Sequence, residues 1–505
     1  MARRSAAFDL TLPARARGVA AYRWLYDSLR SEILRGRLRP GTRLPATRDL
    51  AGQYGLARGT IIAAFERLKS EGYLEGTMGS GTYVSRILPE ELLQVQRVGS
   101  AAAPPLRQQP RLSDYGKRVQ LFGGYGEHPT RAFRSNLPAL ELFPLGVWAR
   151  LSNRSLKDIS RTHLMGCGSL GHLPLRKAIA DYLITSRGVT CTAEQVVITS
   201  GVQEGLDLVA RLLMSPEDAV CVEEPGYPGA SLAFQAAGAK ICAAGLDQEG
   251  IDIRQLPARG VRLLYVTPGH QFPLGMTMSL ARRLQLLDWA RASGAWIFED
   301  DYDSEYRYSG RPIPSLQGLD RSGSVLYAGS FSKVLFPALR LGYLVVPHNL
   351  LAEVEAVKSL TSRHAPILEQ LVLSEFIVEG HFGRHLRRMR EVYAERLTIL
   401  MRESSQLADF LTVSEVQAGL QTVGWLQEGI LADRVAAAAA RRNVQVTPVK
   451  RYGRGLVSRE GLVLGFAAID GREIRRGVRE LAVVLKGMRA PGKVKTRNYR
   501  TGLMR

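Results

Sequence analysis

Between residues 195 and 345, short apolar runs alternate with helix-forming stretches, and this alternation limits the fold more than any other feature of the chain. The runs VVITS, AVCVEEP and AWIFEDDY favour strands that end in polar residues, whereas GVQEGLDLVARLLM and LARRLQLLDWARASG have helical periodicity. Strands that alternate with helices form a mainly parallel sheet. Ligands bind such sheets beyond the carboxyl ends of the strands. The sequence therefore predicts an α/β domain with a site where polar residues follow its strands.

The chain of 505 residues has a net charge of +21, and the excess of basic residues lies at its ends. The first 90 residues carry 15 Lys and Arg against 8 Asp and Glu, and the last 20 carry 7 with no acidic residue. A nearly neutral body with basic ends indicates that the ends meet a polyanion, although an arginine-rich composition would give the same charge.

The cysteines and the apolar segments indicate the compartment. Four separate cysteines without a C-x-x-C pair favour reduced thiols. No apolar stretch has the length of a membrane span, and the N-terminal MARRSAAFDLTLPARARG lacks the apolar core of a signal peptide. We therefore expect a cytoplasmic protein without a membrane partner.

Residues 20–85 have the pattern of three helices followed by a hairpin. Helices are expected over 20–36, 46–53 and 58–72, and a turn around Gly55 joins the second to the third as in a helix-turn-helix. The glycine-rich GYLEGTMGSGTYVS then alternates like a hairpin, as a wing would. The inward residues are expected to be Tyr22, Leu25, Leu29 and Ile33 in the first helix and Ile62, Phe65 and Leu68 in the third.

The segments PGTRLPATRDLA, GLARGT and GSGTYV occur in that order, and this module resembles the winged helix of GntR-type bacterial regulators. The resemblance implies binding to double-stranded DNA, with contacts from Arg48, Arg58 and Thr60 and with Gly79 in the wing. Arg58 could contact guanine or only position a phosphate. Ala57 stands where the family usually has Ser or Thr, so a helix N-cap worth about 1 kcal/mol is absent. A helical interaction module is the alternative, but it would not need a wing.

Composition changes mark the domain boundaries. The Pro-rich, basic stretch AAAPPLRQQPRL predicts an extended, flexible linker over 89–129. It separates a DNA-binding domain at 15–88 from a ligand-binding domain at 130–488. The basic residues 489–505 are expected to form a disordered tail.

Polar residues follow each predicted strand, and each group alone has an ordinary explanation as a helix cap, a turn or loop polarity. The acids of FEDDYDSEY could equally bind a metal ion. One ligand explains all the groups, namely a flat ring with a protonatable nitrogen, a phenolate, an aldehyde and a phosphate, which is pyridoxal 5′-phosphate (PLP). We predict Lys333 for a Schiff base, Asp300 for the ring nitrogen, Tyr302 for the phenolate, Tyr227 for stacking, and Arg340, Ser330 and the turn Ser200-Gly201-Val202-Gln203 for the phosphate.

The motifs EEPGYPG, TPGHQFPLG, FEDDYDSEY and GSFSKVLFPALRLGY resemble those of a class I, fold-type I aminotransferase over about residues 130–485. Fused to a GntR-type winged helix, they resemble the MocR/GabR family of PLP-dependent transcriptional regulators. The resemblance selects Asp300 rather than Asp301, because the family places this aspartate two residues before the phenolate tyrosine. Gln271 or Phe272 stands where aminotransferases use Asn against the phenolate, and only Gln271 can form a hydrogen bond there.

The same resemblance implies a homodimer that senses PLP, or an amine or amino-acid effector, through an internal aldimine. Three departures from the family pattern bear on the ligand and the function. Pro228 and Gly229 follow the stacking tyrosine where GABA-sensing members have arginine, which disfavours a GABA ligand. Val463 stands at about the place of the carboxylate-binding arginine of aminotransferases, and this loss, together with the winged helix, favours a regulator with at most vestigial transaminase activity. Met165 stands near the expected tyrosine that would contact the phosphate from a neighbouring subunit. Arg451 could substitute for the missing arginine or be a surface charge. The alternatives are a catalytic aminotransferase with an accessory DNA-binding domain, and a DNA-binding protein whose PLP site has decayed.

Overall fold

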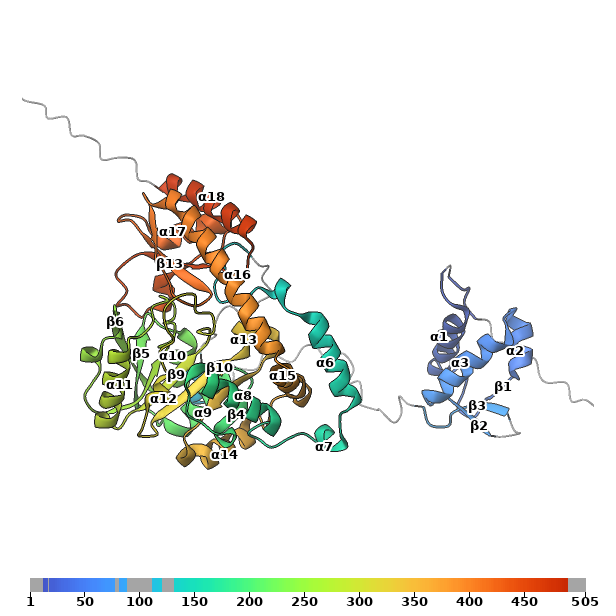
Figure 1. Cartoon of the computed structure of the whole chain (residues 1–505). Coiled ribbons are helices and arrows are strands. Elements are labelled where there is room, and N and C mark those ends of the chain that lie inside the picture. Colours follow the sequence, from blue (N-terminus) through green and yellow to red (C-terminus); the bar gives the residue numbers. More distant parts are fainter. Residues whose placement is uncertain (1–11, 17, 78–80, 89–110, 120–130, 489–505) are drawn as a thin grey trace, which may run out of the picture. The chain divides into compact units, whose positions relative to one another are not determined.

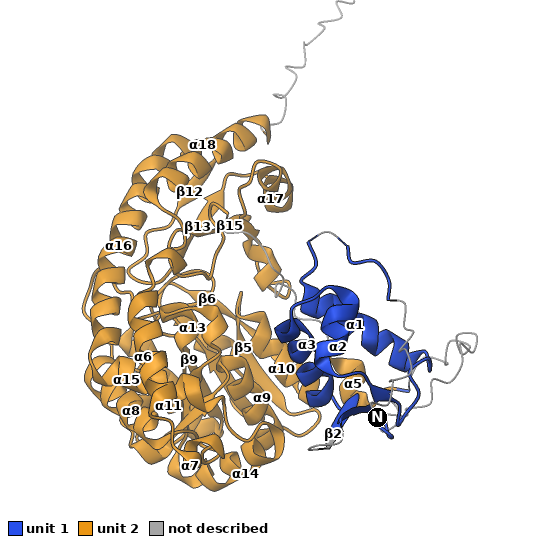
Figure 2. Cartoon of the chain, turned by 90° about the vertical axis from the view of Figure 1, so that its right-hand side faces the viewer, with its two compact units in different colours: residues 1–111 blue, residues 112–505 orange. Residues whose placement is uncertain are grey.

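The computed structural model describes residues 12–16, 18–77, 81–88, 111–119 and 131–488. The chain divides into two compact units, residues 1–111 and 112–505 (Figure 2). No described helix is long and apolar enough to span a membrane.

The N-terminal unit is a winged helix, as predicted. Its three strands pair antiparallel in the order β1-β3-β2, so that β2 and β3 form the wing hairpin. Gly55 ends α2 in the left-handed conformation, with φ 63°, which permits the tight turn into α3. The elements are α1 (Ala21–Leu34), β1 (Arg43–Leu44), α2 (Thr47–Tyr54), α3 (Arg58–Ser70), β2 (Leu74–Thr77) and β3 (Gly81–Val84).

Two residues expected in the core of this unit are exposed. Tyr22 and Ile62 are each 41% exposed, so their inward assignment was wrong. In α3 the inward stripe begins one position earlier, at Ile61, and continues with Phe65 and Leu68 at helical spacing. In α1 Tyr26 takes the inward position one turn after Tyr22.

The larger unit contains an eight-stranded sheet with the order β4-β11-β10-β9-β8-β5-β6-β7. The pairs from β10 through β9, β8 and β5 to β6 are parallel, whereas β11 and β7 pair antiparallel with their neighbours. The mainly parallel α/β sheet is therefore confirmed. The strands are β4 (Val196–Thr199), β5 (Ala219–Glu224), β6 (Lys240–Asp247), β7 (Gly250–Ile251), β8 (Val261–Val266), β9 (Trp296–Asp301), β10 (Val325–Ser330) and β11 (Gly342–Val345).

Helices connect these strands and extend the unit on its N-terminal side. Several follow a strand directly, so their first turns lie at the carboxyl edge of the sheet. They are α6 (Leu145–Lys157), α7 (Arg161–Leu164), α8 (Leu173–Arg187), α9 (Val202–Leu213), α10 (Pro228–Ala237), α11 (Leu280–Ser293), α12 (Leu316–Leu319), α13 (Phe331–Val334), α14 (Leu351–Thr361) and α15 (Ile367–Val378).

A smaller C-terminal lobe completes the unit (orange and red in Figure 1). Its antiparallel sheet has the order β12-β13-β15-β14, and the long helix α16 packs against α18. The lobe comprises α16 (His381–Ser404), β12 (Leu411–Val413), β13 (Gln421–Leu426), α17 (Ala432–Ala440), β14 (Thr447–Pro448), β15 (Gly461–Gly465) and α18 (Gly471–Met488).

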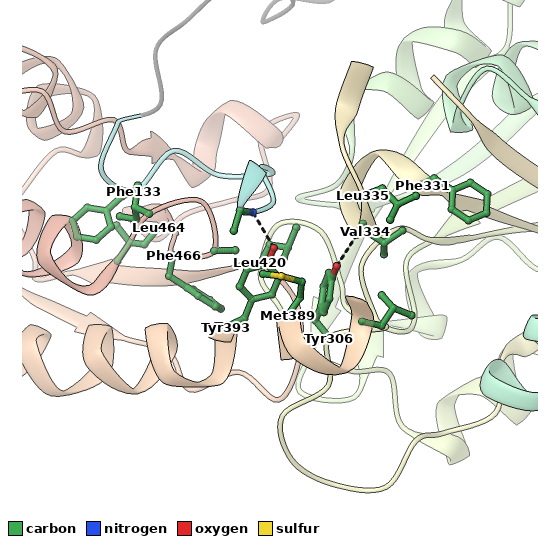
Figure 3. Close-up of a cluster of buried hydrophobic side chains, with 14 of the residues drawn as sticks. Phe133, Tyr306, Phe331, Val334, Leu335, Met389, Tyr393, Leu420, Leu464 and Phe466 are labelled. Carbon is green, nitrogen blue, oxygen red and sulfur yellow. Dashed lines mark hydrogen bonds between the residues drawn. The ribbon is translucent and has the colours of Figure 1, made fainter. Parts of the chain in front are cut away.

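A buried cluster joins the C-terminal lobe to the main sheet (Figure 3). Two tyrosine hydroxyls within it fix the backbone near the sheet edge, since each donates to or accepts from a main-chain group. Tyr306 donates to the carbonyl of Val334 at 3.0 Å, and Tyr393 accepts from the N–H of Ala139 at 2.9 Å. The core therefore positions residues 331–334, which carry Lys333, and residues 131–139, which include its hydrogen-bond partner Asn136.

A short helix lies within the predicted linker. Residues Asp114–Arg118 form α5, and Ser113 caps it by accepting from the N–H of Gly116 at 3.1 Å. The helix packs against α10 and belongs to the larger unit. The predicted linker segments 89–110 and 120–129, and the tail 489–505, lie outside the described residues.

Candidate functional site

A cavity of about 290 Å³ opens at the carboxyl edge of the main sheet. Nine of the eleven predicted ligand-binding residues line it, although they come from four separate segments of the chain. These are Gly201, Val202, Gln203, Tyr227, Asp300, Tyr302, Ser330, Lys333 and Arg340. Tertiary structure thus brings together what the sequence had suggested segment by segment.

Asp300 is the second-last residue of β9 and places a carboxyl group in the cavity wall. Its Oδ2 accepts from the hydroxyl of Tyr265 at 2.6 Å, while its Oδ1 is buried without a hydrogen-bond partner among the described residues. Burial raises the pKa of Asp300 to about 7, although the bond from Tyr265 opposes the rise. One carboxyl oxygen is therefore available to a ligand with a hydrogen-bond donor or a positive charge.

The next residue, Asp301, faces the other side of the sheet because successive strand residues alternate. Its Oδ2 accepts from the guanidinium of Arg187 at 2.6 Å and from the hydroxyl of Tyr327 at 2.6 Å. The choice of Asp300 over Asp301 for the cavity is therefore consistent with the side that each occupies.

The acidic run of FEDDYDSEY does not converge on one point. Glu299 accepts from the backbone N–H groups of Leu316 and Gln317, each at 2.9 Å, and so caps α12. Asp303 bonds to His270. Over the described ranges, no group of three His, Cys, Asp or Glu side chains is arranged to hold a metal ion.

Lys333 lies on the single-turn helix α13, directly after β10. Its Nζ donates to the carbonyl of Asn136 at 2.8 Å. Burial lowers the pKa of Lys333 to about 8, although the charges of Asp303 and Asp300 oppose the shift. A larger fraction of the amine is therefore unprotonated at neutral pH than for an exposed lysine, which makes it a better nucleophile.

The start of α9 and Arg340 together form an anion-binding corner. Gly201 precedes α9 with φ 115°, a conformation that favours glycine. The N–H groups of Val202 and Gln203 come before the first intrahelical hydrogen bond, which the N–H of Glu204 donates to the carbonyl of Gly201 at 3.1 Å. Arg340 has a left-handed backbone, with φ 51°. A Cβ on Gly201 would lie 3.7 Å from the guanidinium of Arg340, so the charge lies beside the helix start. Ser330 accepts from the N–H of Ser332 at 3.1 Å in the same corner.

Tyr227 occupies the N-cap position of α10, where Pro228 starts the helix. Its hydroxyl donates to Oε1 of Gln203 at 3.2 Å, and Nε2 of Gln203 donates to the carbonyl of Gly229 at 3.0 Å. Phe272 packs edge-on against the Tyr227 ring, with centroids 5.8 Å apart. These contacts hold a tyrosine ring in the cavity wall where it could stack on a flat ligand.

Two of the predicted ligand-binding residues, Ser200 and Gln271, do not line the cavity. The Gln271 side chain is instead bonded to neighbouring loops. Its Nε2 donates to the carbonyl of Pro225 at 2.9 Å, and its Oε1 accepts from the N–H of Leu274 at 3.1 Å. Phe272 lines the cavity instead. Gln271 therefore fixes two loops, and the assignment of its side chain to the ligand is corrected.

Five further residues line the cavity although no ligand contact was predicted for any of them from the sequence: Asn136, Tyr265, Phe272, Ser332 and Pro337. Asn136, with φ 65°, precedes the main sheet by many residues and carries no recognisable motif. Tyr265 lies within the apolar run RLLYVTPG, where a buried tyrosine gives no sign of a hydrogen bond to Asp300. The alternation of side chains along a strand could have predicted that Tyr265 faces the cavity. No local pattern could have predicted that Asn136 lines it.

The structure also shows where the residues lie that depart from the family pattern or could compensate for a departure. Val463 is buried in β15 with Val423 and Val449. Arg451 is an exposed residue that pairs with Asp433 at 3.1 Å, so it is a surface charge rather than a cavity arginine. Met165 is 85% exposed.

The predicted DNA contacts lie on the helix-turn-helix. Arg48 in α2 and Arg58, the first residue of α3, are exposed, and Thr60 is half-buried. Ala57 precedes α3 without a side-chain cap, as its residue type requires. Gly79 lies outside the described residues.

Each of the two units matches a known protein family. Residues 140–481 match the family of class I and II aminotransferases, and residues 21–84 match the gntR family of bacterial regulatory proteins. The chain is 40% identical to the probable rhizopine catabolism regulatory protein MocR of Rhizobium meliloti, over 94% of this chain and 95% of that protein. It is 30% identical to the pyridoxine biosynthesis transcriptional regulator PdxR of Corynebacterium glutamicum, over 91% of this chain and 94% of that protein.

Solved structures match the larger unit. An archaeal alanine:glyoxylate aminotransferase is 28% identical with a TM-score of 0.67, and the match covers 72% of this chain and 92% of that one. LysN, an α-aminoadipate aminotransferase from Thermus thermophilus, is 29% identical with a TM-score of 0.67, covering 75% and 97% respectively.

Proposed function

The chain belongs to the MocR-type family of transcriptional regulators, in which a GntR domain is fused to an aminotransferase-like domain, and we propose that its DNA binding responds to PLP in the cavity. The observation that carries the proposal is the buried Oδ1 of Asp300, which has no hydrogen-bond partner in the described part of the chain and lies in the same cavity as Lys333. A buried carboxyl oxygen without a partner is costly, and the protonated ring nitrogen of PLP would relieve that cost.

The residues around the cavity fit the other parts of PLP. Arg340 and the first turn of α9 would hold the phosphate, because a guanidinium and unpaired N–H groups favour an anion. Tyr227 would stack on the ring, and Tyr302 would face the phenolate. When bound, PLP supplies an aldehyde that condenses reversibly with amines. The lowered pKa of Lys333 favours its neutral amine for that chemistry.

The cavity also bears on the class of effector. Within the described ranges, Arg340 is the one arginine that lines it. A dicarboxylate or a GABA-like acid would bring a second negative group, for which the described lining offers no second arginine. PLP itself, or an amine or amino acid that exchanges with Lys333, is therefore the effector, and PLP is favoured because its anionic group already has a partner.

The winged helix reads the operator as part of a homodimer in the cytoplasm. Support for a dimer comes from α6, α7 and the residue that follows α7, where Leu145, Leu156, Leu164 and Met165 are each more than half exposed. Such an exposed apolar surface favours a protein–protein contact. Light scattering at micromolar concentration tests the dimer.

The experiment that tests the function compares wild type with Lys333→Ala. DNA from upstream of the gene is titrated by fluorescence anisotropy with and without PLP, and PLP binding is followed by visible absorbance. Lys333→Ala is expected to lose the bound-cofactor absorbance and the response to PLP, while its DNA affinity stays within about threefold of wild type. A variant without any DNA affinity, or a wild type that is indifferent to PLP and to amines, would contradict the proposal.

A catalytic aminotransferase is the second candidate, because Asp300, Tyr302 and Lys333 are all present in the cavity. The buried Val463 and the surface position of Arg451 weigh against it, since neither supplies a carboxylate contact. Steady-state transamination assays across amino acids and amines distinguish the two. Many turnovers at enzyme-like rates would favour the enzyme, whereas a regulator shows at most vestigial turnover.

A further inference from the structure

His270 lies beneath Tyr302 and shares one ring nitrogen between two partners. Its Nδ1 is 3.0 Å from the hydroxyl of Tyr302 and 2.8 Å from Oδ1 of Asp303. The ring is 2% exposed, and its Nε2 is buried without a hydrogen-bond partner in the described part of the chain.

These contacts select one tautomer of the ring. An ionised carboxylate only accepts hydrogen bonds, so the Nδ1 that faces Asp303 must carry a hydrogen. The Nε2–H tautomer would set a lone pair against the carboxylate and leave a buried donor unpaired. A doubly protonated ring would also bury an unpaired Nε2–H. The Nδ1–H tautomer, with a bare Nε2, is therefore the one that fits.

The tautomer in turn decides the role of Tyr302. Because Nδ1 already carries a hydrogen, it cannot accept the hydroxyl proton of Tyr302, whose oxygen can only accept from it. No other acceptor for this hydroxyl occurs among the described residues, and Tyr302 lines the cavity. We propose that Asp303 and His270 are positioning residues that make Tyr302 an obligatory hydrogen-bond donor to the ligand. For PLP, which rests on the function proposed above, the acceptor is the phenolate oxygen.

The C-terminal lobe holds this arrangement in place. Oδ2 of Asp303 accepts from the N–H of Leu420 at 3.1 Å, which leaves Oδ1 for His270. Gly419, with φ 89°, lies against the ring, and a side chain at this position would collide with His270. The backbone of one lobe thus fixes the hydrogen-bond direction at the cavity in the other.

The tautomer can be measured without any cofactor. The full-length protein is labelled with 13C at histidine Cδ2 in a deuterated background, and the His270 signal is identified by its loss in His270→Asn. The 13Cδ2 shift separates the two neutral tautomers from each other and from the charged ring. The Nδ1–H signature is expected, and an Nε2–H signature would overturn the proposal even if the protein never binds PLP.

A second test uses the pH midpoint of the visible band of bound PLP. A hydrogen bond to the phenolate favours the form with fewer protons, so Tyr302→Phe is expected to raise the midpoint by about one pH unit. In Asp303→Asn the amide oxygen can still face Leu420 while its NH₂ faces His270. That NH₂ would convert Nδ1 into an acceptor, which would draw the Tyr302 proton away from the ligand.

Asp303→Asn is therefore expected to raise the midpoint like Tyr302→Phe, although it keeps the tyrosine. Loss of a nearby negative charge alone would lower the midpoint, so the direction separates the two effects. His270→Asn, whose amide can donate to both oxygens, should keep the wild-type midpoint. An unchanged or lowered midpoint in Asp303→Asn, with a raised one in Tyr302→Phe, would overturn the proposal. A wild type without a visible band would instead refute PLP binding.

An independent observation concerns α5 and the helices on which it rests. Nε of Arg118 donates to the carbonyl of Ala236 at 3.1 Å, in the last turn of α10. The guanidinium of Arg211, in the last turn of α9, lies 5.7 Å from the ring centre of Tyr115. α5 therefore bridges the C-terminal ends of α9 and α10.

The other ends of the same two helices form part of the cavity. α9 starts at Val202 and Gln203, and α10 starts directly after Tyr227. Gln203 and Tyr227 are hydrogen-bonded to each other across the two helix starts. We infer that α5 senses the positions of α9 and α10 and so couples the cavity to the chain that leads to the DNA-binding unit. This inference also rests on the proposed function.

Arg118→Ala and Tyr115→Ala test the coupling, with Lys117→Ala as a matched control on the same helix. Lys117 bonds to Asp114 within α5. The measured quantity is the ratio of DNA affinities with and without PLP. In the two test variants the ratio should fall toward one, while PLP affinity and DNA affinity without PLP stay within about twofold of wild type.

Lys117→Ala should keep the wild-type ratio. An unchanged ratio in both Arg118→Ala and Tyr115→Ala would overturn the role of α5. A wild-type ratio of one would instead refute the proposed function, so the two failures are distinguishable.

Discussion

Strand β9 ends in two consecutive aspartates that lie in contrasting surroundings on the two sides of the sheet. Asp301 is satisfied by Arg187 and Tyr327, and although burial alone would raise its pKa, Arg187 holds that pKa below its usual range. Among the residues that the structure describes, Asp300 has Tyr265 as its one hydrogen-bond partner, and burial raises its pKa to about 7. The comparison teaches that Asp301 finds its partners within the protein, whereas Asp300 keeps one oxygen that the proposed ligand would pair with.

The largest effect is expected on the Asp301 side. Arg187→Met would leave a buried carboxylate without its cation, so the free energy of unfolding should fall by about 3–5 kcal/mol. Urea denaturation followed by circular dichroism measures the loss. The double variant Arg187→Met/Asp301→Asn should recover most of it, because the charge is removed with its partner. A loss below about 1 kcal/mol in the single variant would mean that Asp301 does not depend on Arg187.

The Asp300 side should show the opposite behaviour. The raised pKa means that the folded, ligand-free protein binds a proton that the unfolded chain has released between about pH 4 and 7. Its contribution to stability therefore falls as the pH rises through this window. Asp300→Asn should be more stable than wild type at pH 8 by about 1–3 kcal/mol, with the difference vanishing near pH 4.

The same variant should lose its affinity for PLP by tenfold or more, since a neutral amide cannot pair with a charged ring nitrogen. Thermal unfolding at several pH values and a cofactor titration measure the two effects. If the stability of Asp300→Asn and of wild type depended on pH in the same way, burial would not raise the pKa of Asp300 as proposed.

Burial also shifts the pKa of a basic group in the cavity, that of Lys333. Because its pKa is lowered to about 8, the fraction of neutral amine rises as the pH increases from 7 to 9. The rate of PLP uptake should therefore increase several-fold over this range and level off above about pH 9. Stopped-flow absorbance measures it. A rate that keeps rising toward pH 10.5 would indicate an ordinary, solvated lysine.

The smallest difference between the two aspartates should come from their tyrosine partners, Tyr265 at Asp300 and Tyr327 at Asp301. Tyr327→Phe removes one of several donors to Asp301 and should cost about 1 kcal/mol of stability without changing PLP affinity. Tyr265→Phe removes the bond that orients Asp300, so it should weaken PLP binding several-fold. Isothermal unfolding and cofactor titration of both variants test this contrast, which would disappear if the two variants behaved alike.

The sequence predicted much of this molecule because many of its features are local. The helix-turn-helix, the wing and the parallel sheet follow from periodicity and turn residues, and all three are confirmed. The errors concerned the direction in which single side chains point. Ile62 was predicted to face the core, but Ile61 does so instead. Gln271 was assigned to the ligand, but its amide bonds to neighbouring loops.

What the sequence alone determined was the set of chemical groups at the strand ends, because the covalent order of DDY and of SFSK fixes which residues follow which strand. Tertiary structure decided which of those groups have partners. The bond from Tyr265 to Asp300, the bond from Lys333 to the carbonyl of Asn136 and the contact of Gly419 with His270 join residues far apart in the chain. Such contacts depend on how lobes and loops pack, and no local pattern records that packing.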